Sequence, residues 1–184
     1  DVVSLGTVSK NSTINGGDGD DSIYSSVVSG SLIIDGGAGD DYVELDSVSG
    51  LVSIIGSDGN DSIVVDSLTG SLIINATSGS INLSINSADG YVSIDGSMDG
   101  DDQIYIDSIG SNGSTLVNIS LGSGNDTITI GATANSLSVD AGSGDDIVQV
   151  SIVSGSVTLD GGSGNDSITL GDLGDKASVT IDAG

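Results

Sequence analysis

The stretch Gly36-Gly37-Ala38-Gly39-Asp40-Asp41-Tyr42-Val43 decides the fold, because its pattern returns at a fixed interval along the chain. We call the position of its second Asp the Asp slot. The slots are filled by Asp21, Asp41, Asp61, Asp102, Asp126, Asp146 and Asp166, in steps of 20, 20, 41, 24, 20 and 20 residues. Asp1 lies one period before Asp21, and Ile81 fills the slot inside the step of 41. A period of about 20–50 residues is typical of solenoids, so we expect nine coils in one domain spanning residues 1–184.

Aliphatic residues recur at the same interval. One ladder of Val, Ile and Leu lies two residues after each Asp slot, and a second lies four residues after it, with Ser25 as the exception. A third ladder precedes the glycines, as at Ile34. Two interruptions are expected in the turns, a one-residue insertion at residues 96–100 and a longer loop at residues 110–114.

Each coil is interpreted as two short strands and two turns. Alternation places Val43 and Leu45 inside and the residues beside them outside, over expected strands 42–45 and 51–54, with the second turn at 46–50. Stacked coils then form two parallel sheets, face to face over a thin aliphatic core. At about 4.8 Å per coil the nine coils give a rod of about 43 Å. The predicted fold is an all-β parallel β-roll, or β-solenoid, with no helix.

The composition excludes several classes of protein. There are 27 acidic residues and 2 basic ones, so the net charge is −25, which does not suit a nucleic-acid binder or an anionic membrane surface. The chain has no Cys and no His, so it has no disulfide, no thiol nucleophile and no imidazole site. No run of about 18 apolar residues is present, and we expect no membrane insertion.

The acidic turns predict a cation. Stacking places successive Asp carboxylates about 4.8 Å apart, where two bare charges repel by about 3–4 kcal/mol at an effective dielectric constant near 20. Turn glycines at positive φ direct carbonyl oxygens outward. Calcium prefers about six to eight oxygens from carboxylates and carbonyls, whereas magnesium demands strict octahedral geometry and retains its waters. A column of calcium ions therefore accounts for the pattern best.

The turn resembles the hemolysin-type calcium-binding repeat of RTX proteins, whose pattern is G-G-x-G-x-D-x-U-x. The resemblance implies that glycine carbonyls and Asp carboxylates hold several Ca2+ ions between successive coils. The residues that it assigns to calcium are Asp1, Gly17, Gly19, Asp21, Gly37, Gly39, Asp41, Gly59, Asp61, Asp102, Gly124, Asp126, Gly142, Gly144, Asp146, Gly162, Gly164 and Asp166.

The chain departs from the family pattern in one important way. Family repeats are nine residues long, so that a coil carries two motifs, whereas here only one half of each 20-residue coil carries the motif. We therefore expect calcium along one edge only. The turn that ends at Ile81 has no carboxylate, so the ion column is expected to break there, and Ser57 and Ser97 replace the second glycine in two turns.

Two further sets of Asp and Asn residues flank the glycines and the Asp slot. The Asp before the glycines is either a calcium ligand or an outward residue that keeps the sheet solvated, and solvation is favoured: Asp35, Asp95, Asp140, Asp160 and Asp182. The residue before the Asp slot is expected to offer its carbonyl and to direct its side chain to water: Asp20, Asp40, Asn60, Asp101, Asn125, Asp145 and Asn165.

These features predict a structural role outside the cell, in a prokaryote. We expect a calcium-stabilised rod, part of a surface adhesin, a surface layer or a matrix fibre, that folds on binding calcium. The chain is expected to be a segment of a longer repeat protein or a filament subunit that assembles end to end with other copies. No catalytic residue is expected and the chain is not predicted to be an enzyme, because it has no Arg and because Lys10 and Lys176 lie at opposite ends. The surface ligand is not predicted.

Two alternatives remain open. Some RTX adhesins carry an ice-binding module with a flat Thr and Asn array, which turns such as 122–126 resemble with Ser in place of Thr. The chain could instead be a secretion or folding module of a larger secreted protein.

Overall fold

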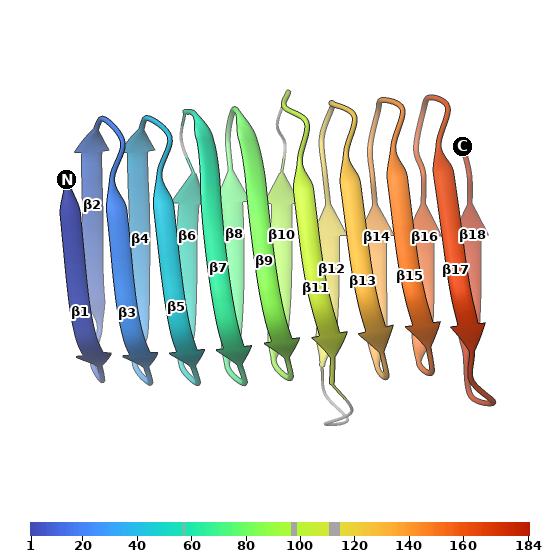
Figure 1. Ribbon diagram of the computed structural model, residues 1–184, viewed down its shortest axis with the longest axis horizontal. Coiled ribbons are helices and arrows are strands. Elements are labelled where there is room, and N and C mark those ends of the chain that lie inside the picture. Colours follow the sequence, from blue (N-terminus) through green and yellow to red (C-terminus); the bar gives the residue numbers. More distant parts are fainter. Residues whose placement is uncertain (57, 97–98, 111–114) are drawn as a thin grey trace.

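The computed structural model describes residues 1–56, 58–96, 99–110 and 115–184, and these residues form two nine-stranded sheets (Figure 1). The odd-numbered strands form the first sheet in sequence order. They are β1 (Val2–Val8), β3 (Ser22–Val28), β5 (Tyr42–Val48), β7 (Asn60–Leu68), β9 (Ser80–Ala88), β11 (Gln103–Ile109), β13 (Thr127–Thr133), β15 (Ile147–Val153) and β17 (Ser167–Leu173).

The even-numbered strands form the second sheet, also in sequence order. They are β2 (Ser12–Asp18), β4 (Ser31–Ala38), β6 (Leu51–Gly56), β8 (Ser71–Ala76), β10 (Tyr91–Gly96), β12 (Leu116–Ser120), β14 (Ser136–Asp140), β16 (Ser156–Asp160) and β18 (Ser178–Asp182). The two sheets lie face to face, and the chain crosses from one to the other at each edge of the stack (Figure 1).

Neighbouring strands pair in parallel and in the register that the repeat predicts. Val43 on β5 pairs with Ile23 on β3 and with Ile63 on β7, so one period advances the chain by one coil. The predicted β-solenoid of nine coils with two strands each is confirmed. In the described part of the chain no helix has the length and hydropathy to span a bilayer.

The core is a thin layer of aliphatic side chains between the sheets. Ile23, Leu45 and Ile63 on the first sheet and Leu32 and Ile34 on the second are completely or almost completely buried, as the alternation requires. Parallel strands buried by a facing sheet are usually rich in Val, Ile and Leu, and the ladders supply these residues in every coil. The core therefore runs unbroken along the stack.

The second turn of each coil is shorter than the sequence predicts. The prediction of a turn over 46–50 is wrong at its start, because β5 continues to Val48 and that side chain is fully buried, as is Leu68 one coil later. Asp46 and Ser47 both lie outside between Leu45 and Val48, so the strand bends and the alternation shifts by one residue. In these coils the burial of one more aliphatic side chain outweighs the turn preference of the Asp-Ser pair.

A glycine closes this second edge because the coils approach closely there. A Cβ atom at Gly50 would lie 1.9 Å from the carbonyl oxygen of Gly30 in the preceding coil. No side chain fits at that distance, which explains Gly50 and, one coil later, Gly70, where a Cβ atom would lie 2.0 Å from the carbonyl oxygen of Gly50. The expectations for Ser57, Ser97, the insertion at 96–100 and the loop at 110–114 lie wholly or partly outside the described residues.

Candidate metal centre

The buried acidic residues of the described chain all lie at one edge of the stack. This is the edge where each even strand leads through the glycine turn to the next odd strand, at the top of Figure 1. Each stands two residues before the first inward aliphatic residue of its strand, so the alternation directs its side chain into the coil. The buried set is Asp21, Asp41, Asp61, Asp102, Asp126 and Asp146, and Asp166 at the same slot is partly exposed.

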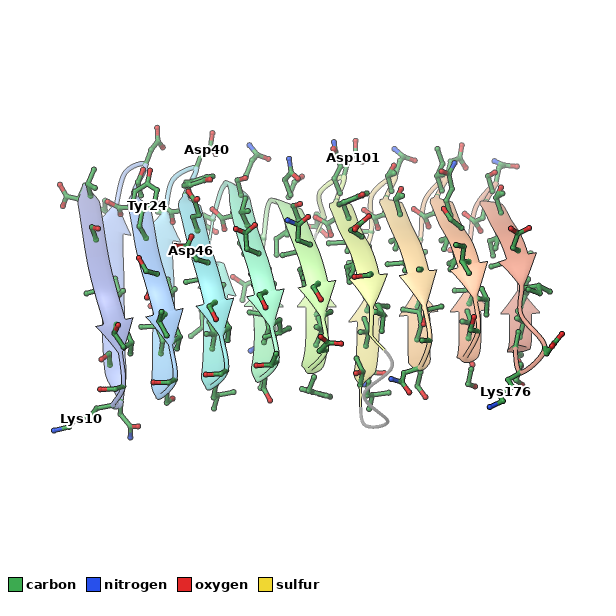
Figure 2. All side chains as sticks on the ribbon, turned by 60° about the horizontal axis from the view of Figure 1, so that its bottom comes forward. Lys10, Tyr24, Asp40, Asp46, Asp101 and Lys176 are labelled. Atoms are coloured by element: carbon green, nitrogen blue, oxygen red, sulfur yellow. The ribbon has the colours of Figure 1, made fainter. Side chains whose placement is uncertain are left out.

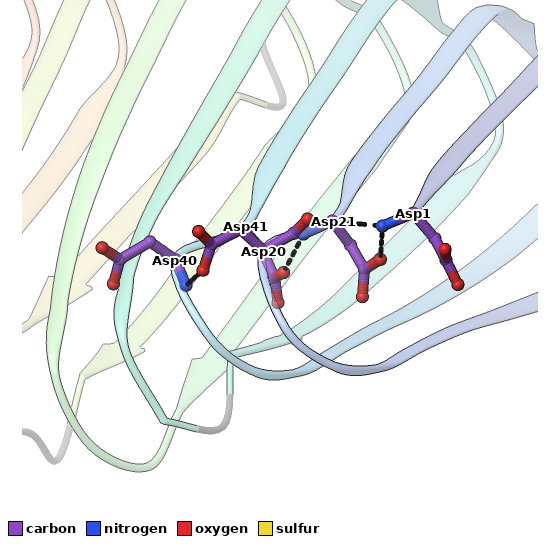
Figure 3. A network of polar contacts seen from close by, with 5 residues as sticks. All are labelled: Asp1, Asp20, Asp21, Asp40 and Asp41. Atoms are coloured by element: carbon purple, nitrogen blue, oxygen red, sulfur yellow. Dashed lines mark hydrogen bonds and ion pairs between the residues drawn. The ribbon is translucent and has the colours of Figure 1, made fainter.

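The Asp-slot carboxylates form a ladder of hydrogen bonds, which we call the inner ladder. The backbone N–H of one slot donates to Oδ1 of the Asp in the next coil, at 2.7–3.0 Å. The first coils appear in Figure 3, where the ammonium group of Asp1 lies 2.6 Å from Asp21 Oδ1. The donor and acceptor pairs are Asp21 to Asp41, Asp41 to Asp61, Ile81 to Asp102, Asp102 to Asp126, Asp126 to Asp146 and Asp146 to Asp166.

The second oxygen of these carboxylates has no partner. The Oδ2 atoms of Asp21, Asp41, Asp102, Asp126, Asp146 and Asp166 are buried and accept no hydrogen bond. In the first coils this oxygen lies against the first turn glycine, since a Cβ atom at Gly36 would lie 2.1 Å from Asp41 Oδ2. A buried, unpaired carboxylate oxygen is costly, and here it recurs along the edge.

Burial weakens the acidity of the inner ladder. Burial raises the pKa of Asp61 and Asp102 to about 6 and that of Asp126 to about 7. The backbone hydrogen bond that each of these carboxylates accepts lowers its pKa, but by less than burial raises it. The charges of Asp102, Asp146 and Asp101 raise the pKa of Asp126 further. The pKa values of Asp41 and Asp146 are also raised, first by burial. The folded chain thus favours either protons or a cation at this edge.

All ten turn glycines that the sequence assigns to the site have the left-handed backbone expected of them. Their φ angles lie between 85° and 145°, and the residues are Gly17, Gly19, Gly37, Gly39, Gly59, Gly124, Gly142, Gly144, Gly162 and Gly164. Gly79, in the turn before Ile81, has φ of 83° and was not assigned. The glycine backbone is therefore kept even where the carboxylate is lost.

A second ladder runs along the outside of the same edge, and the sequence analysis missed it. We call it the outer ladder. Side chains of the residue before the Asp slot are exposed, as expected, but five of them accept a hydrogen bond from the backbone of the following coil, namely Asp20, Asp40, Asp101, Asn125 and Asp145. Asp20 Oδ1 accepts from Asp40 N at 3.0 Å, and Asp145 Oδ1 accepts from Asn165 N at 2.8 Å. The recurrence of Asp or Asn at the position before the Asp slot is the sequence feature that could have predicted this ladder.

Asn residues in the outer ladder relieve the repulsion between its carboxylates. The amide of Asn165 donates a further bond to Asp145 Oδ1 at 2.9 Å, and Asn125 and Asn60 donate in the same way to Asp101 and Asp40. The bonds from Asn165 lower the pKa of Asp145. The outer ladder is therefore satisfied by protein donors, whereas the inner ladder is not.

The inner ladder of carboxylates is interrupted at Ile81, and a break of the ion column at this point stays a prediction. Ile81 pairs in register with Asp61, is buried, and offers no carboxylate to the preceding coil. Backbone strand pairing extends into this place, so that β7 and β9 are already paired at Asn60 and Ser80. Both strands are nine residues long, whereas β5 has seven residues. The Asp carboxylate elsewhere thus occupies a place that strand pairing would otherwise fill.

The Asp before the glycines has a local role in two coils. Asp160 Oδ1 accepts from Gly162 N at 3.0 Å, and Asp182 Oδ1 accepts from Gly184 N at 3.2 Å. These contacts brace the turn and are the short-range bonds that Asp commonly makes in turns. Asp1 lies in register before Asp21, with an exposed side chain, and it contacts Asp21 through its ammonium group.

The residues of this edge fit a hard divalent cation. The unpaired Oδ2 atoms supply charged oxygen ligands, and the lysines that could neutralise them, Lys10 and Lys176, lie at the opposite edge from Asp40 and Asp101 (Figure 2). Within the described residues no three acidic side chains converge closely enough to hold a metal by themselves. A cation here would complete its coordination with turn carbonyls, which calcium accepts readily.

Comparison with known proteins agrees with this chemistry. The family model of the RTX calcium-binding nonapeptide repeat matches four stretches, residues 9–27, 33–48, 49–67 and 154–176. No curated protein and no solved structure matches the chain significantly. Repeats of this kind bind Ca2+ in the turns between coils and are typical of secreted proteins. The unmatched stretch between residues 68 and 153 contains the Ile81 break and three more carboxylates of the inner ladder.

Proposed function

Because this chain belongs to the RTX β-roll family and is a calcium-dependent structural module, we propose that it serves outside the cell as a rod that calcium holds in its folded form. The observation that carries this proposal is the inner ladder. Its buried Oδ2 atoms recur along one edge without a partner, and they carry negative charge that the fold does not neutralise. Calcium at this edge would convert the largest unfavourable feature of the fold into a cross-link between coils.

We assign the calcium ligands to the inner ladder and to the turn carbonyls of the glycines that precede it. The carboxylates are those of Asp21, Asp41, Asp61, Asp102, Asp126, Asp146 and Asp166, with Asp1 in the corresponding place of the first coil. The opposite edge closes on glycine in several coils, as at Gly50 and Gly70, and carries no buried carboxylate among the described residues, which supports calcium along one edge. The ion column is interrupted at Ile81.

The charge of the chain favours a location outside the cell. Modest calcium sites with dissociation constants of about 10⁻⁴–10⁻³ M fill in extracellular fluids and stay empty in the cytosol. A chain with a net charge of −25 repels itself when no cation is bound. It would therefore remain unfolded inside the cell and fold after export.

A structural role at the surface follows from this behaviour. A stiff rod with calcium cross-links suits a surface adhesin, a surface layer or a matrix fibre, and the proposal does not assign an enzymatic activity. End-to-end assembly stays a prediction, and analytical ultracentrifugation at saturating calcium over a range of protein concentrations would test it.

A calcium titration followed by circular dichroism tests the proposed function. We expect a coil-like spectrum in chelator, cooperative formation of strand signal as calcium is added, and reversal on chelation. Magnesium at the same concentration should give little strand signal, because it releases its waters reluctantly. A calcium-free chain at neutral pH with the full strand signal would contradict the proposal.

The ice-binding alternative finds weaker support. It needs the third turn position to carry one kind of side chain over many coils. Ser123, Ser143 and Ser163 do pair in register, but the corresponding slots near the N-terminus hold Asp18, Ala38 and Asp58. Thermal hysteresis measured in calcium would support this alternative, and we expect none.

A further inference from the structure

The contact between the fourth and fifth coils differs from the others along the acidic edge. We call these two coils, residues 58–96 with strands β7 to β10, the central coils, and they lie in the middle of the stack (Figure 1). At the other contacts between the second and the ninth coil, an Asp-slot carboxylate accepts a hydrogen bond from the coil before it, whereas here Ile81 fills the slot. We propose that the central coils are a folding nucleus whose internal contact needs no calcium, and that calcium-dependent folding spreads from them toward both ends of the rod.

Ile81 places a buried aliphatic side chain where the repeat otherwise buries a charge. It is 2% exposed and lies in register with Asp61. Burial of a carboxylate is unfavourable unless a partner neutralises it, whereas burial of an isoleucine is favourable at any calcium concentration. Ala76, five residues earlier, is also buried and belongs to the same hydrophobic cluster as Ile81. At the contact between the central coils, the aliphatic core thus reaches the acidic edge.

The turn that joins the central coils is held to the turn before it by neutral donors. The backbone N–H and the hydroxyl group of Thr77 both donate to the carbonyl oxygen of Gly56, at 3.0 and 3.3 Å. The backbone N–H of Ser80 donates to the carbonyl oxygen of Gly59 at 3.1 Å. These bonds connect the two turns without a carboxylate of the inner ladder, so they form whether or not a cation is present.

The central coils also contain the part of the chain with the least self-repulsion. The longest stretch without a charged side chain runs from Ser67 to Ala88 and includes the whole of β8 and β9. On the outer face, the amide of Asn86 donates to Asp66 Oδ1 at 3.3 Å, so a neutral group stands opposite the nearest carboxylate. In a chain with a net charge of −25, this stretch becomes compact at the smallest electrostatic cost before calcium binds.

The nucleus determines where folding begins and does not replace calcium. In a solenoid each coil contacts only its neighbours, so folding can begin at one place and spread along the stack. At least about three repeats are usually needed for stability, so two coils are too few, and the calcium-free chain keeps a coil-like spectrum. At limiting calcium the central coils should be folded in the largest fraction of molecules.

Hydrogen exchange of the backbone amides at limiting calcium tests this order of folding. The calcium concentration is set at the midpoint of the strand signal, and exchange is followed peptide by peptide with mass spectrometry. We expect the amides of β7 to β10 to exchange most slowly, and the protection to fall toward both β1 and β17. Slowest exchange at either end of the rod, or uniform exchange in all coils, would overturn the nucleus.

A matched pair of variants separates the effect of Ile81 from that of a central position, because the ends of any stack open more readily. Ile81→Asp restores the repeat without moving the coils. At the same calcium concentration it should accelerate exchange in the central coils about ten- to hundredfold, the range expected from burial of one isoleucine side chain. Ser80→Asp adds the same charge one residue earlier and should have a much smaller effect. Wild-type protection in Ile81→Asp would overturn the proposal.

A nucleus should also be transferable to another coil. Asp146 stands five residues after Ala141, as Ile81 stands five residues after Ala76, and both alanines are buried. Asp146→Ile therefore reproduces the same pair of side chains at the contact between the seventh and eighth coils. We expect slow exchange to appear in β13 to β16 at limiting calcium, away from the centre of the stack. If no protection is gained there, the proposal is wrong, even where Ile81→Asp fails to fold.

The nucleus rests on the proposed calcium-dependent folding, and the two proposals fail in different measurements. A full strand signal in chelator at neutral pH would contradict the calcium-dependent rod. A strand signal that depends on calcium, with exchange that is not slowest in the central coils, would contradict the nucleus and leave the calcium-dependent rod intact.

Discussion

The Asp-slot side chain stands where a backbone carbonyl would otherwise serve the neighbouring strand. Its Oδ1 atom takes the N–H of the preceding coil, and its Oδ2 atom is left for an external partner. In the outer ladder the backbone N–H of one coil donates to a side chain of the preceding coil, which is the reverse of the inner ladder. Its Asp oxygens also accept bonds from Asn side chains, as Asp145 does from Asn165. Neighbouring residues of the chain therefore differ in role. The carboxylate before the Asp slot is held by protein donors, and the one at the Asp slot keeps an oxygen that we expect to bind a cation.

Replacing Asp146 by Ala should reduce the stabilisation that calcium gives. The carboxylate lies between two coils, so we expect the loss of about 2.7 kcal/mol in the free energy of unfolding for each site removed, with calcium at about a hundred times its dissociation constant. Urea unfolding with and without calcium measures this difference. Asp66→Ala, which removes one exposed charge from the face of β7, is the matched control, and an equal effect of both variants would contradict the ligand assignment.

The raised pKa values predict that the calcium-free chain is more stable in acid. The unfolded pKa of Asp is about 3.9, and the folded pKa values reach about 6 at Asp61 and Asp102 and about 7 at Asp126. The folded state then holds protons that the unfolded state releases. The stability from these groups is complete below about pH 4 and is lost as the pH rises through about 6–7.

Dichroism of the chelated chain between pH 3.5 and pH 8 checks this prediction. We expect strand signal at the acidic end and its loss toward neutral pH, and saturating calcium should abolish the loss. A chelated chain that is most stable at pH 7 would contradict the buried, unpaired carboxylates.

At the level of strands, the period and the alternation were enough to predict the sheets, the register and the carboxylate column. The register of Asp61 with Ile81 was readable because Leu83 keeps the aliphatic ladder in phase. The inward position of Val48 was not readable, because the bend at Asp46 and Ser47 shifts the alternation and the pair resembles a turn. The sequence also could not predict whether each side chain accepts its hydrogen bond from the preceding or from the following coil, because this depends on which backbone N–H the side chain faces.

Restoring the missing carboxylate should join the two halves of the ion column. Ile81→Asp places an acceptor opposite Asp61 in the register of the repeat. We expect at least one more bound calcium per chain by isothermal titration, and lower stability in chelator because an aliphatic core residue is lost. Ser80→Asp adds the same charge one residue earlier and should add no ion. An unchanged stoichiometry in Ile81→Asp would argue against the column.

The residues at the bend should behave as core. Leu68 is fully buried at the end of β7, so Leu68→Ala should cost about 2–5 kcal/mol of unfolding free energy in saturating calcium. Leu51→Ala, on the outer face with 40% of the residue exposed, should cost far less. Urea unfolding compares them, and equal costs would mean that the second turn begins where the sequence places it.

The whole molecule is a stack in which each coil contacts its neighbours, so its stability grows by adding coils and the ions between them. The aliphatic core does not stabilise the acidic edge, because burial makes the ionised form of the Asp-slot carboxylates less favourable. Calcium binding and folding are therefore expected to be one cooperative process. At the opposite edge, where the coils approach closely at glycines such as Gly50, we expect no ion.

A crystal grown with ample calcium, measured by anomalous diffraction, tests this account most directly. We predict a row of calcium peaks beside the Oδ2 atoms of the inner ladder, on one edge of the stack and interrupted at Ile81. Peaks confined to the opposite edge, or no metal beside Asp41 and Asp146, would contradict it.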